Sequence, residues 1–366
     1  MTWGRQRILA LVFALLALQL GSLVSPAYAC GCGAMVPGHD QQIGVDRETS
    51  VVRWNGRTEQ IVMRFTVRGN AKQAAWIMPV PDRADVELGD PQVFTDLAWA
   101  TRPEEKDRYY FWPRNGDWPF ADTTADGAGA PPLPGAGDPG VGVVGRERLG
   151  PFDVARLTAT DPNALSGWLK TNGFELSDQL SGALRPYVDM KWEYVAVRLA
   201  PDEKNATLYG ELDPLKIRFA SHELVYPMRL SRLAKNPQSL GLYVLADHRM
   251  EPQAPIGGKK PEVKFAGKIT PEGPVAALTE GKPVYLTQID QEFPNPARID
   301  GDHVLRAADA DTPYREVTYN DRLQMFGGMP AWLATVTGVP FAAAAAAAAF
   351  VLIRLRRRRA GVRSAA

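Results

Sequence analysis

The chain has 366 residues, with 42 lysines and arginines, 41 aspartates and glutamates and only two cysteines. Two basic residues lie in the first 29 positions and six in the last 13, which leaves 34 basic residues against all 41 acids between them. This acidic middle argues against nucleic-acid binding, which needs a basic face, and two cysteines exclude a disulfide framework.

Residues 1–29 have the pattern of a cleaved signal peptide. Two arginines precede an apolar run from Ile8 to Val24, and Ala27-Tyr28-Ala29 has the small-x-small spacing that a signal peptidase cleaves. The alternative is an uncleaved membrane anchor, but Pro26 interrupts the helix just before the cleavage site. Cleavage makes Cys30 the mature N-terminus and predicts export.

Cys30 and Cys32 are the sharpest local candidates for chemistry. Separated by one glycine, they could form a strained disulfide, bind a soft metal such as Cu(I) or Zn(II), carry a lipid on Cys30 or stay free. A disulfide that tethers the N-terminus is favoured. Two thiols are incomplete as a structural zinc site, which needs four ligands, and Ala27 stands where lipoprotein signals usually have leucine.

The exported residues 30–328 predict an α+β fold, with a strand-rich mixed or antiparallel sheet and a few helices. Thirty prolines and 33 glycines are typical of a turn-rich chain. Asn55-Gly56 predicts a tight hairpin, and a strand over Ala74–Met78 ends at Pro79, which cannot donate to a sheet. Further strands are expected at Phe152–Leu157, Tyr194–Leu199, Leu215–Phe219, Leu224–Leu230, Leu240–Leu245, Val263–Phe265, Pro283–Ile289 and Arg315–Tyr319.

Three helices are expected in the same region. One covers Pro91–Thr101, a second starts at the cap Asp161-Pro162 and stops at Gly173, and a third covers Leu176–Tyr187.

Residues 103–149 are expected to form a loop or linker, and a possible break between two subdomains. The segment begins with six aromatic residues and continues with about 22 residues made mostly of Ala, Gly, Pro and Asp. The aromatic part could be a stacking surface for sugars or a membrane-facing patch, but packing of the loop onto the core is favoured. The aromatic residues are Tyr109, Tyr110, Phe111, Trp112, Trp118 and Phe120.

Residues 329–353 predict a transmembrane helix. The apolar run from Ala331 to Ile353 has about 23 residues, which at about 1.5 Å each covers the roughly 30 Å hydrocarbon core. The basic tail 354–366 fixes the orientation, because clustered arginines stay on the cytoplasmic side. The prediction is a single-pass cell-membrane protein with its body outside the cytoplasm. The tail arginines nearest the span are Arg354, Arg356, Arg357, Arg358 and Arg359.

Several separated motifs resemble one bacterial exported family, domain of unknown function 2330. The resemblance covers roughly Ala29 to Arg249, and it implies export but no established activity, so no catalytic residue is carried over. The motifs are Cys30-Gly31-Cys32-Gly33, Ala75-Trp76-Ile77-Met78-Pro79-Val80-Pro81, Gly150-Pro151-Phe152-Asp153-Val154, Leu165-Ser166-Gly167-Trp168-Leu169-Lys170-Thr171-Asn172-Gly173-Phe174, Trp192-Glu193-Tyr194-Val195-Ala196-Val197 and Val225-Tyr226-Pro227-Met228-Arg229-Leu230.

Two of these motifs suggest a groove. Trp76 and Met78 in one, and Tyr226 and Met228 in the other, stand beside a proline at the end of a predicted strand. If the two strand ends adjoin, they could line an apolar groove with Arg229 as its charged anchor, suited to a peptide or an anionic ligand. The favoured alternative is that they are core and strand-end residues.

No zinc-protease, serine-hydrolase or phosphate-loop signature occurs in the sequence. Asp300-Gly301-Asp302 spaces carboxylates as a calcium site does, but the EF-hand pattern is not met, so a solvated loop is expected. The favoured function is therefore non-catalytic binding or interaction with a cell-envelope protein or peptide, with no cofactor assigned. The alternative is an envelope metal-binding, redox or hydrolytic protein that uses Cys30 and Cys32.

Overall fold

The computed structural model describes most of the chain, in two compact units. The first unit contains the described residues up to Arg102 and from 142 to 316, and the second those in 103–141 and 317–366. Residues 1–32, with the expected signal peptide, Cys30 and Cys32, lie outside the described part. The described residues are 33–114, 116–117, 148–149, 152–157, 162–201, 206–257 and 259–363.

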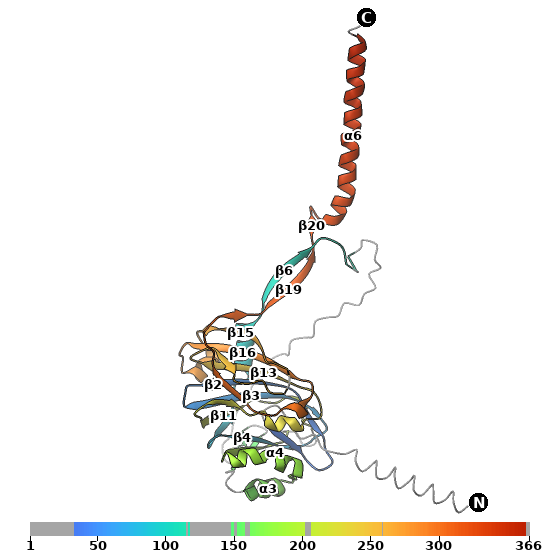
Figure 1. Ribbon diagram of the computed structural model, residues 1–366. Helices are drawn as coiled ribbons and strands as arrows, with labels where there is room; N and C mark the ends of the chain where they lie inside the picture. Colours follow the sequence, from blue (N-terminus) through green and yellow to red (C-terminus); the bar gives the residue numbers. More distant parts are fainter. Residues whose placement is uncertain are drawn as a thin grey trace, which may run out of the picture. The chain divides into compact units, whose positions relative to one another are not determined.

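A nine-stranded sheet is the largest element of the first unit (Figure 1). Its order is β18-β15-β16-β13-β2-β3-β11-β5, with β10 paired to β3. Neighbours are antiparallel except β13 and β2, which makes the sheet mixed. The strands are β2 (Ile43–Trp54), β3 (Thr58–Gly69), β5 (Asp85–Leu88), β10 (Gly210–Glu211), β11 (Leu215–Ala220), β13 (Gln238–Ala246), β15 (Glu262–Ile269), β16 (Val284–Phe293) and β18 (Tyr314–Arg315).

The predicted hairpin is confirmed as β2–β3. Gly56 has φ +88°, a left-handed value that favours glycine. The side chain of Asn55 accepts hydrogen bonds from the backbone N–H groups of Arg57 at 3.1 Å and Thr58 at 2.9 Å. The turn therefore satisfies its own donors and fixes the register of the two longest strands.

Two smaller sheets pack against the large one. One has the order β1-β4-β9-β8-β7 and the other β12-β17-β14. The expected strand Leu224–Leu230 ends early at Tyr226, because Pro227 interrupts it and a 3-10 helix follows, η1 (Arg229–Leu233). The strands are β1 (Ala34–Pro37), β4 (Ala74–Val80), β7 (Arg148–Leu149), β8 (Phe152–Leu157), β9 (Glu193–Leu199), β12 (Leu224–Tyr226), β14 (Met250–Pro252) and β17 (His303–Ala307).

Helices cover the outer faces of this double layer. α2 (Gln92–Thr101) and α5 (Gly273–Thr279) bury apolar residues against the large sheet, and α3 (Pro162–Thr171) and α4 (Asp178–Asp189) do so against the β4 sheet. The three expected helices are confirmed as α2, α3 and α4, whereas α5 was not predicted. The α+β fold class expected from the sequence is also confirmed.

β4 lies at the centre of the layers, and all seven of its residues are buried. Trp76 and Met78 face the core shared with the large sheet, and Ala75 and Ile77 face the core under α3 and α4. A strand with both faces covered needs an unbroken apolar sequence, which is what β4 has. Pro79 is tolerated because β1 pairs only as far as Ile77.

The second unit contains a two-stranded parallel ribbon, β6 (Glu104–Tyr110) and β19 (Val317–Leu323) (Figure 1). The start of the expected loop 103–149 is thus a strand, whose pairing partner lies more than 200 residues away in the sequence. Trp118 and Phe120 lie outside the described residues. After β19 come the short strands β20 (Met325–Phe326) and β21 (Met329–Pro330).

The last helix, α6, runs from Ala331 to Arg363. Within its segment Ala331–Arg356, the most apolar 18-residue stretch has a mean hydropathy of 2.1, and none of that stretch is buried within the protein. Among the described side chains of this segment, only Ala331 and Trp332, at the start of the helix, are buried. A helix of this length and exposure can span a membrane, as the sequence predicts.

Candidate functional site

One buried carboxylate, on Asp302, organises the best-defined polar site of the first unit. Its Oδ1 accepts hydrogen bonds from the hydroxyl of Tyr187 at 2.6 Å and from the backbone N–H groups of Met228 at 2.8 Å and Arg229 at 2.9 Å. Its Oδ2 lies 3.2 Å from Nε of Arg229. The Asp302 side chain is 6% exposed, and its charge is held by four donors, one of which belongs to the Arg229 cation.

The local chain explains why these donors are available. Pro227 ends β12, and the backbone then enters η1, whose first N–H groups have no partner within the helix. Asp302 comes directly before β17, which pairs with β12, and its carboxylate therefore meets those N–H groups. Burial, and secondly the Asp302 charge, raise the pKa of Tyr187, which keeps its hydroxyl a donor.

A pocket of about 350 Å³ opens beside this carboxylate. The Arg229 side chain is 31% exposed and reaches the pocket with its Nε held by Asp302. Apolar side chains line much of the wall, and the carboxylates of Glu223 and Asp300 are exposed beside it. The lining residues are Met190, Trp192, Glu223, Val225, Arg229, Ala254, Pro255, Ile256, Asp300, Gly301, Asp302 and Val304.

A buried acid lies behind the pocket wall. Glu59 is fully buried, and its Oε2 accepts a hydrogen bond from the backbone N–H of Val225 at 3.1 Å. Burial raises the pKa of Glu59 well above its usual value, and the nearby charge of Glu223 raises it further, although the Val225 hydrogen bond opposes the shift. Through this hydrogen bond, Glu59 supports the strand that carries Val225.

A larger pocket, of about 710 Å³, lies between the loop after β1 and the α3–α4 region. Its polar groups include surface side chains such as His39 and Asp40, which are 86% and 85% exposed and contact each other at 2.8 Å. Surface pairs of this kind contribute little binding energy. The smaller pocket is the stronger candidate because its guanidinium is fixed by a buried carboxylate.

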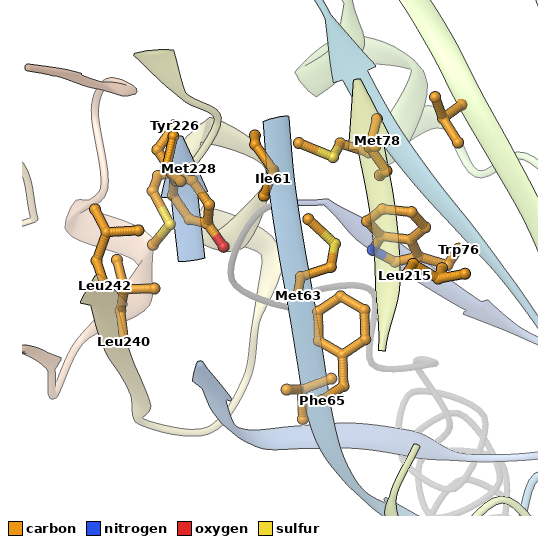
Figure 2. Packing of buried hydrophobic residues seen from close by; sticks show 14 of the residues in the cluster. Ile61, Met63, Phe65, Trp76, Met78, Leu215, Tyr226, Met228, Leu240 and Leu242 are labelled. Carbon is orange, nitrogen blue, oxygen red and sulfur yellow. The ribbon is translucent and has the colours of Figure 1, made fainter. Parts of the chain in front are cut away.

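The possible groove, which was the less favoured interpretation of the sequence, is not open in the structure. Trp76, Met78 and Tyr226 are 0% exposed and Met228 is 1% exposed, all in one apolar core. In the view of Figure 2, β3 side chains such as Ile61 lie between the two pairs. Strand alternation points these side chains inward, so Arg229 is the one residue of the five that lines the candidate pocket.

Tyr226 instead belongs to a buried polar cluster. Its hydroxyl is 2.6 Å from Oγ of Ser50 and donates to the carboxylate of Glu48. All three side chains are at most 1% exposed. A substrate cannot reach them, so the cluster is an internally satisfied part of the core.

Cys30 and Cys32 lie outside the described residues, and their disulfide, metal, lipid or free state stays a prediction. Within the described part of the chain, no group of three His, Cys, Asp or Glu side chains is placed to hold a metal ion.

Sequence reasoning missed Asp302 as an organising residue. The solvated loop expected at Asp300-Gly301-Asp302 is correct for Asp300, which is exposed, but wrong for the Asp302 side chain. The spacing of the two aspartates, Asp300 and Asp302, was the one feature of the sequence that pointed to this loop. The donors it meets lie 73 or more residues away, so the pattern alone could not distinguish the two carboxylates.

His303, next to Asp302, makes the site region sensitive to acid. The side chain is 2% exposed, and burial lowers its pKa to about 4, although Asp302 opposes the shift. The unfolded chain takes up this proton near pH 6.5 and the folded chain only near pH 4. Stability from this residue is therefore complete above pH 6.5 and falls by about 3 kcal/mol as the pH drops to 4.

We expect His303→Phe to remove this loss, because phenylalanine fills the space and does not titrate. Urea unfolding of the wild type and the variant between pH 7.5 and 4 measures the free energy of unfolding of each. Glu59 is present in both proteins, so its contribution to the pH dependence cancels in the difference. The exposed His39→Gln is the control. Parallel pH profiles for wild type and His303→Phe would contradict the prediction.

The fold and the site together define a class of protein. It is a layered α+β protein with a small charged pocket and a C-terminal helix able to act as a membrane anchor. The chain belongs to the bacterial family DUF2330, described as "Uncharacterized protein conserved in bacteria", which matches residues 26–306. The match confirms the resemblance and extends it beyond Arg249, so that β15 and β16 belong to the shared region, whereas β19 and α6 lie beyond it.

Among solved structures, the crystal structure of baculovirus P35 matches at 10% identity with a TM-score of 0.30. The alignment covers 75% of this chain and 99% of that chain. No curated protein matches at a significant level.

Proposed function

We propose that this protein is a membrane-anchored binding protein whose layered body lies outside the cytoplasm and captures a peptide segment in the Arg229 pocket. The observation that carries the proposal is the guanidinium of Arg229, fixed by the buried Asp302 in an otherwise largely apolar pocket.

The location is supported by the two ends of the chain. A signal-like segment precedes Cys30, and α6 combines an unburied apolar stretch with the arginines that follow it. Together these features favour export of the body and retention of the tail inside.

The ligand class follows from the charges around the pocket. A fixed guanidinium suits a carboxylate, because it offers several donors in a planar array. The exposed carboxylates of Glu223 and Asp300 suit a positive group, and the apolar wall with Trp192 suits an aliphatic or aromatic side chain. A short peptide that carries both charges supplies all three groups.

Binding can be tested on the full-length protein in lipid nanodiscs with a phage-displayed random peptide library, followed by calorimetry of one selected peptide. We expect Arg229→Gln to weaken binding of that peptide about tenfold to a hundredfold, the loss typical of a charged hydrogen bond. Arg232→Gln is the matched control, because Arg232 belongs to the same 3-10 helix but is exposed outside the pocket. Equal affinity for the two variants, or no selected peptide, would count against the proposal.

A further inference from the structure

The parallel ribbon of the second unit brings two distant aromatic and apolar segments to one end. Tyr110 pairs with Leu323, the last residues of β6 and β19. Because the strands are parallel, the residues that leave both strands emerge on the same side. Phe111 and Trp112 follow β6, and the β20–β21 hairpin follows β19.

Backbone hydrogen bonds connect this end of the ribbon to the start of α6. The N–H of Gln324 donates to the carbonyl of Tyr110 at 2.9 Å, and the N–H of Ala331 donates to the carbonyl of Gln324 at 2.8 Å. Ala331 is the first residue of α6. Two backbone hydrogen bonds that share Gln324 therefore link the end of the ribbon to the start of the helix.

The hairpin between them has a tight glycine turn. Gly327 and Gly328 have φ values of +58° and +84°, as a two-residue type I′ turn requires. Phe326 and Met329 pair across it. The turn thus holds two large apolar side chains next to each other immediately before the helix.

Five large side chains in these segments are exposed, between 44% and 75% of their surface. Exposed clusters of apolar residues beside a helix that can span a membrane are typical of a membrane-interface site. We call these five the juxtamembrane surface: Tyr109, Trp112, Met325, Phe326 and Met329. The expected packing of the aromatic segment onto the core is therefore wrong for Tyr109 and Trp112.

The length of α6 places this surface at the right depth. If Arg354 marks the inner edge of the hydrocarbon core, the outer edge lies about 20 residues earlier, near Ala334. Ala331 then lies roughly 5 Å above that edge, within a headgroup layer about 5 to 7 Å thick. Met325, opposite Pro330 in the hairpin, falls in the same layer.

The charges of the ribbon are already paired with each other. Arg108 and Arg114 contact Asp321 at 2.6 and 2.5 Å, and Arg322 contacts Asp107 at 2.7 Å. Because these arginines have internal partners, attraction to anionic lipid is not the main driving force. The main driving force for membrane contact is the burial of apolar surface.

We propose that the juxtamembrane surface inserts into the headgroup and acyl boundary of the bilayer that α6 crosses, and so seats the ribbon on the membrane. The inference rests on the proposed membrane anchor, but not on the Arg229 pocket. The ligand is the lipid surface itself, taken up by aromatic and methionine side chains.

The test is photo-crosslinking of the full-length protein in phosphatidylcholine nanodiscs. Benzoylphenylalanine replaces one exposed aromatic residue at a time, and mass spectrometry detects lipid adducts. Phe326 and Trp112 test the juxtamembrane surface, and Phe350 tests α6. Tyr209, 71% exposed in the first unit, is the matched aqueous control.

We expect lipid adducts at positions 326, 112 and 350 and none at 209, with similar yields when anionic lipid is added. Adducts at 350 but not at 326 or 112 would overturn the inference and leave the anchor intact. Absence of adducts at 350 as well would overturn the anchor and the inference together. Adducts at 326 and 112 that require anionic lipid would overturn the apolar insertion proposed here.

Discussion

Replacing Ala343 and Ala344 in α6 by arginine is expected to move the protein from the membrane to the soluble fraction. An arginine near the centre of a spanning helix costs about 2.5 to 3.5 kcal/mol, so the pair costs about 6 kcal/mol. The eight alanines Ala342–Ala349 contribute little insertion energy of their own, which leaves small reserve against this cost. Carbonate extraction, ultracentrifugation and immunoblotting measure the partition.

The matched control is Ala343→Leu with Ala344→Leu, which we expect to keep the protein in the membrane. In intact cells stripped of their outer layers, external protease should degrade the body and spare a tag placed after Ala366. Retention of the double-arginine variant in carbonate-washed membranes would show that α6 is not the membrane anchor. Protection of the body from external protease would show that the body lies on the cytoplasmic side, opposite to the predicted orientation.

The second large effect is expected for Asp302→Ala, which should lower the free energy of unfolding by roughly 3 to 5 kcal/mol. The substitution leaves the Tyr187 hydroxyl and two backbone N–H groups without their acceptor, and Arg229 without its counter-ion. Buried donors that lose their partners cost more than the hydrogen bonds contribute. Guanidinium unfolding of the full-length protein in detergent, followed by tryptophan fluorescence, gives the value.

Asp300→Ala is the control for this prediction, because Asp300 lies two residues away and is exposed. It should change the free energy of unfolding by less than about 0.5 kcal/mol. Asp302→Asn, which keeps an acceptor oxygen but loses the charge, should fall between the two. If Asp302→Ala is no more destabilising than Asp300→Ala, the carboxylate does not organise the site.

Local features of the fold were predictable from the sequence. The β2–β3 hairpin and the helices α2, α3 and α4 depend on turn, cap and spacing signals that lie within a few neighbouring residues. β4 was predictable because its residues are uniformly apolar. These signals act over short distances, so the rest of the chain was not needed to recognise them.

Elements that depend on distant partners were missed. β6 has the sequence Glu-Glu-Lys-Asp-Arg-Tyr-Tyr, which contains no apolar alternation, and it becomes a strand by pairing with β19. β1 and β17 are short and take their register from β4 and β12. A strand whose main stabilisation comes from pairing leaves little pattern in its own residues.

The candidate site also combines a feature that the local sequence predicts with features that depend on distant contacts. The sequence pointed to Arg229 as the charged anchor of a possible groove, but it left open whether the four apolar residues line that groove or, as was favoured, belong to the core. The same apolar residues suit both environments. Whether a side chain faces solvent depends on which layer covers its strand. That information lies in the packing of the sheets rather than in the motif.

The sequence by itself determined the membrane-compatible end of the protein and its family, because a long apolar helix and a set of spaced motifs need no tertiary contact to be recognised. Only the tertiary structure decided that Asp302 is buried while Asp300 is exposed, and that Trp112 lies at the same end of the ribbon as Phe326. The physical reason is that burial and strand register are set by contacts between residues far apart in the chain.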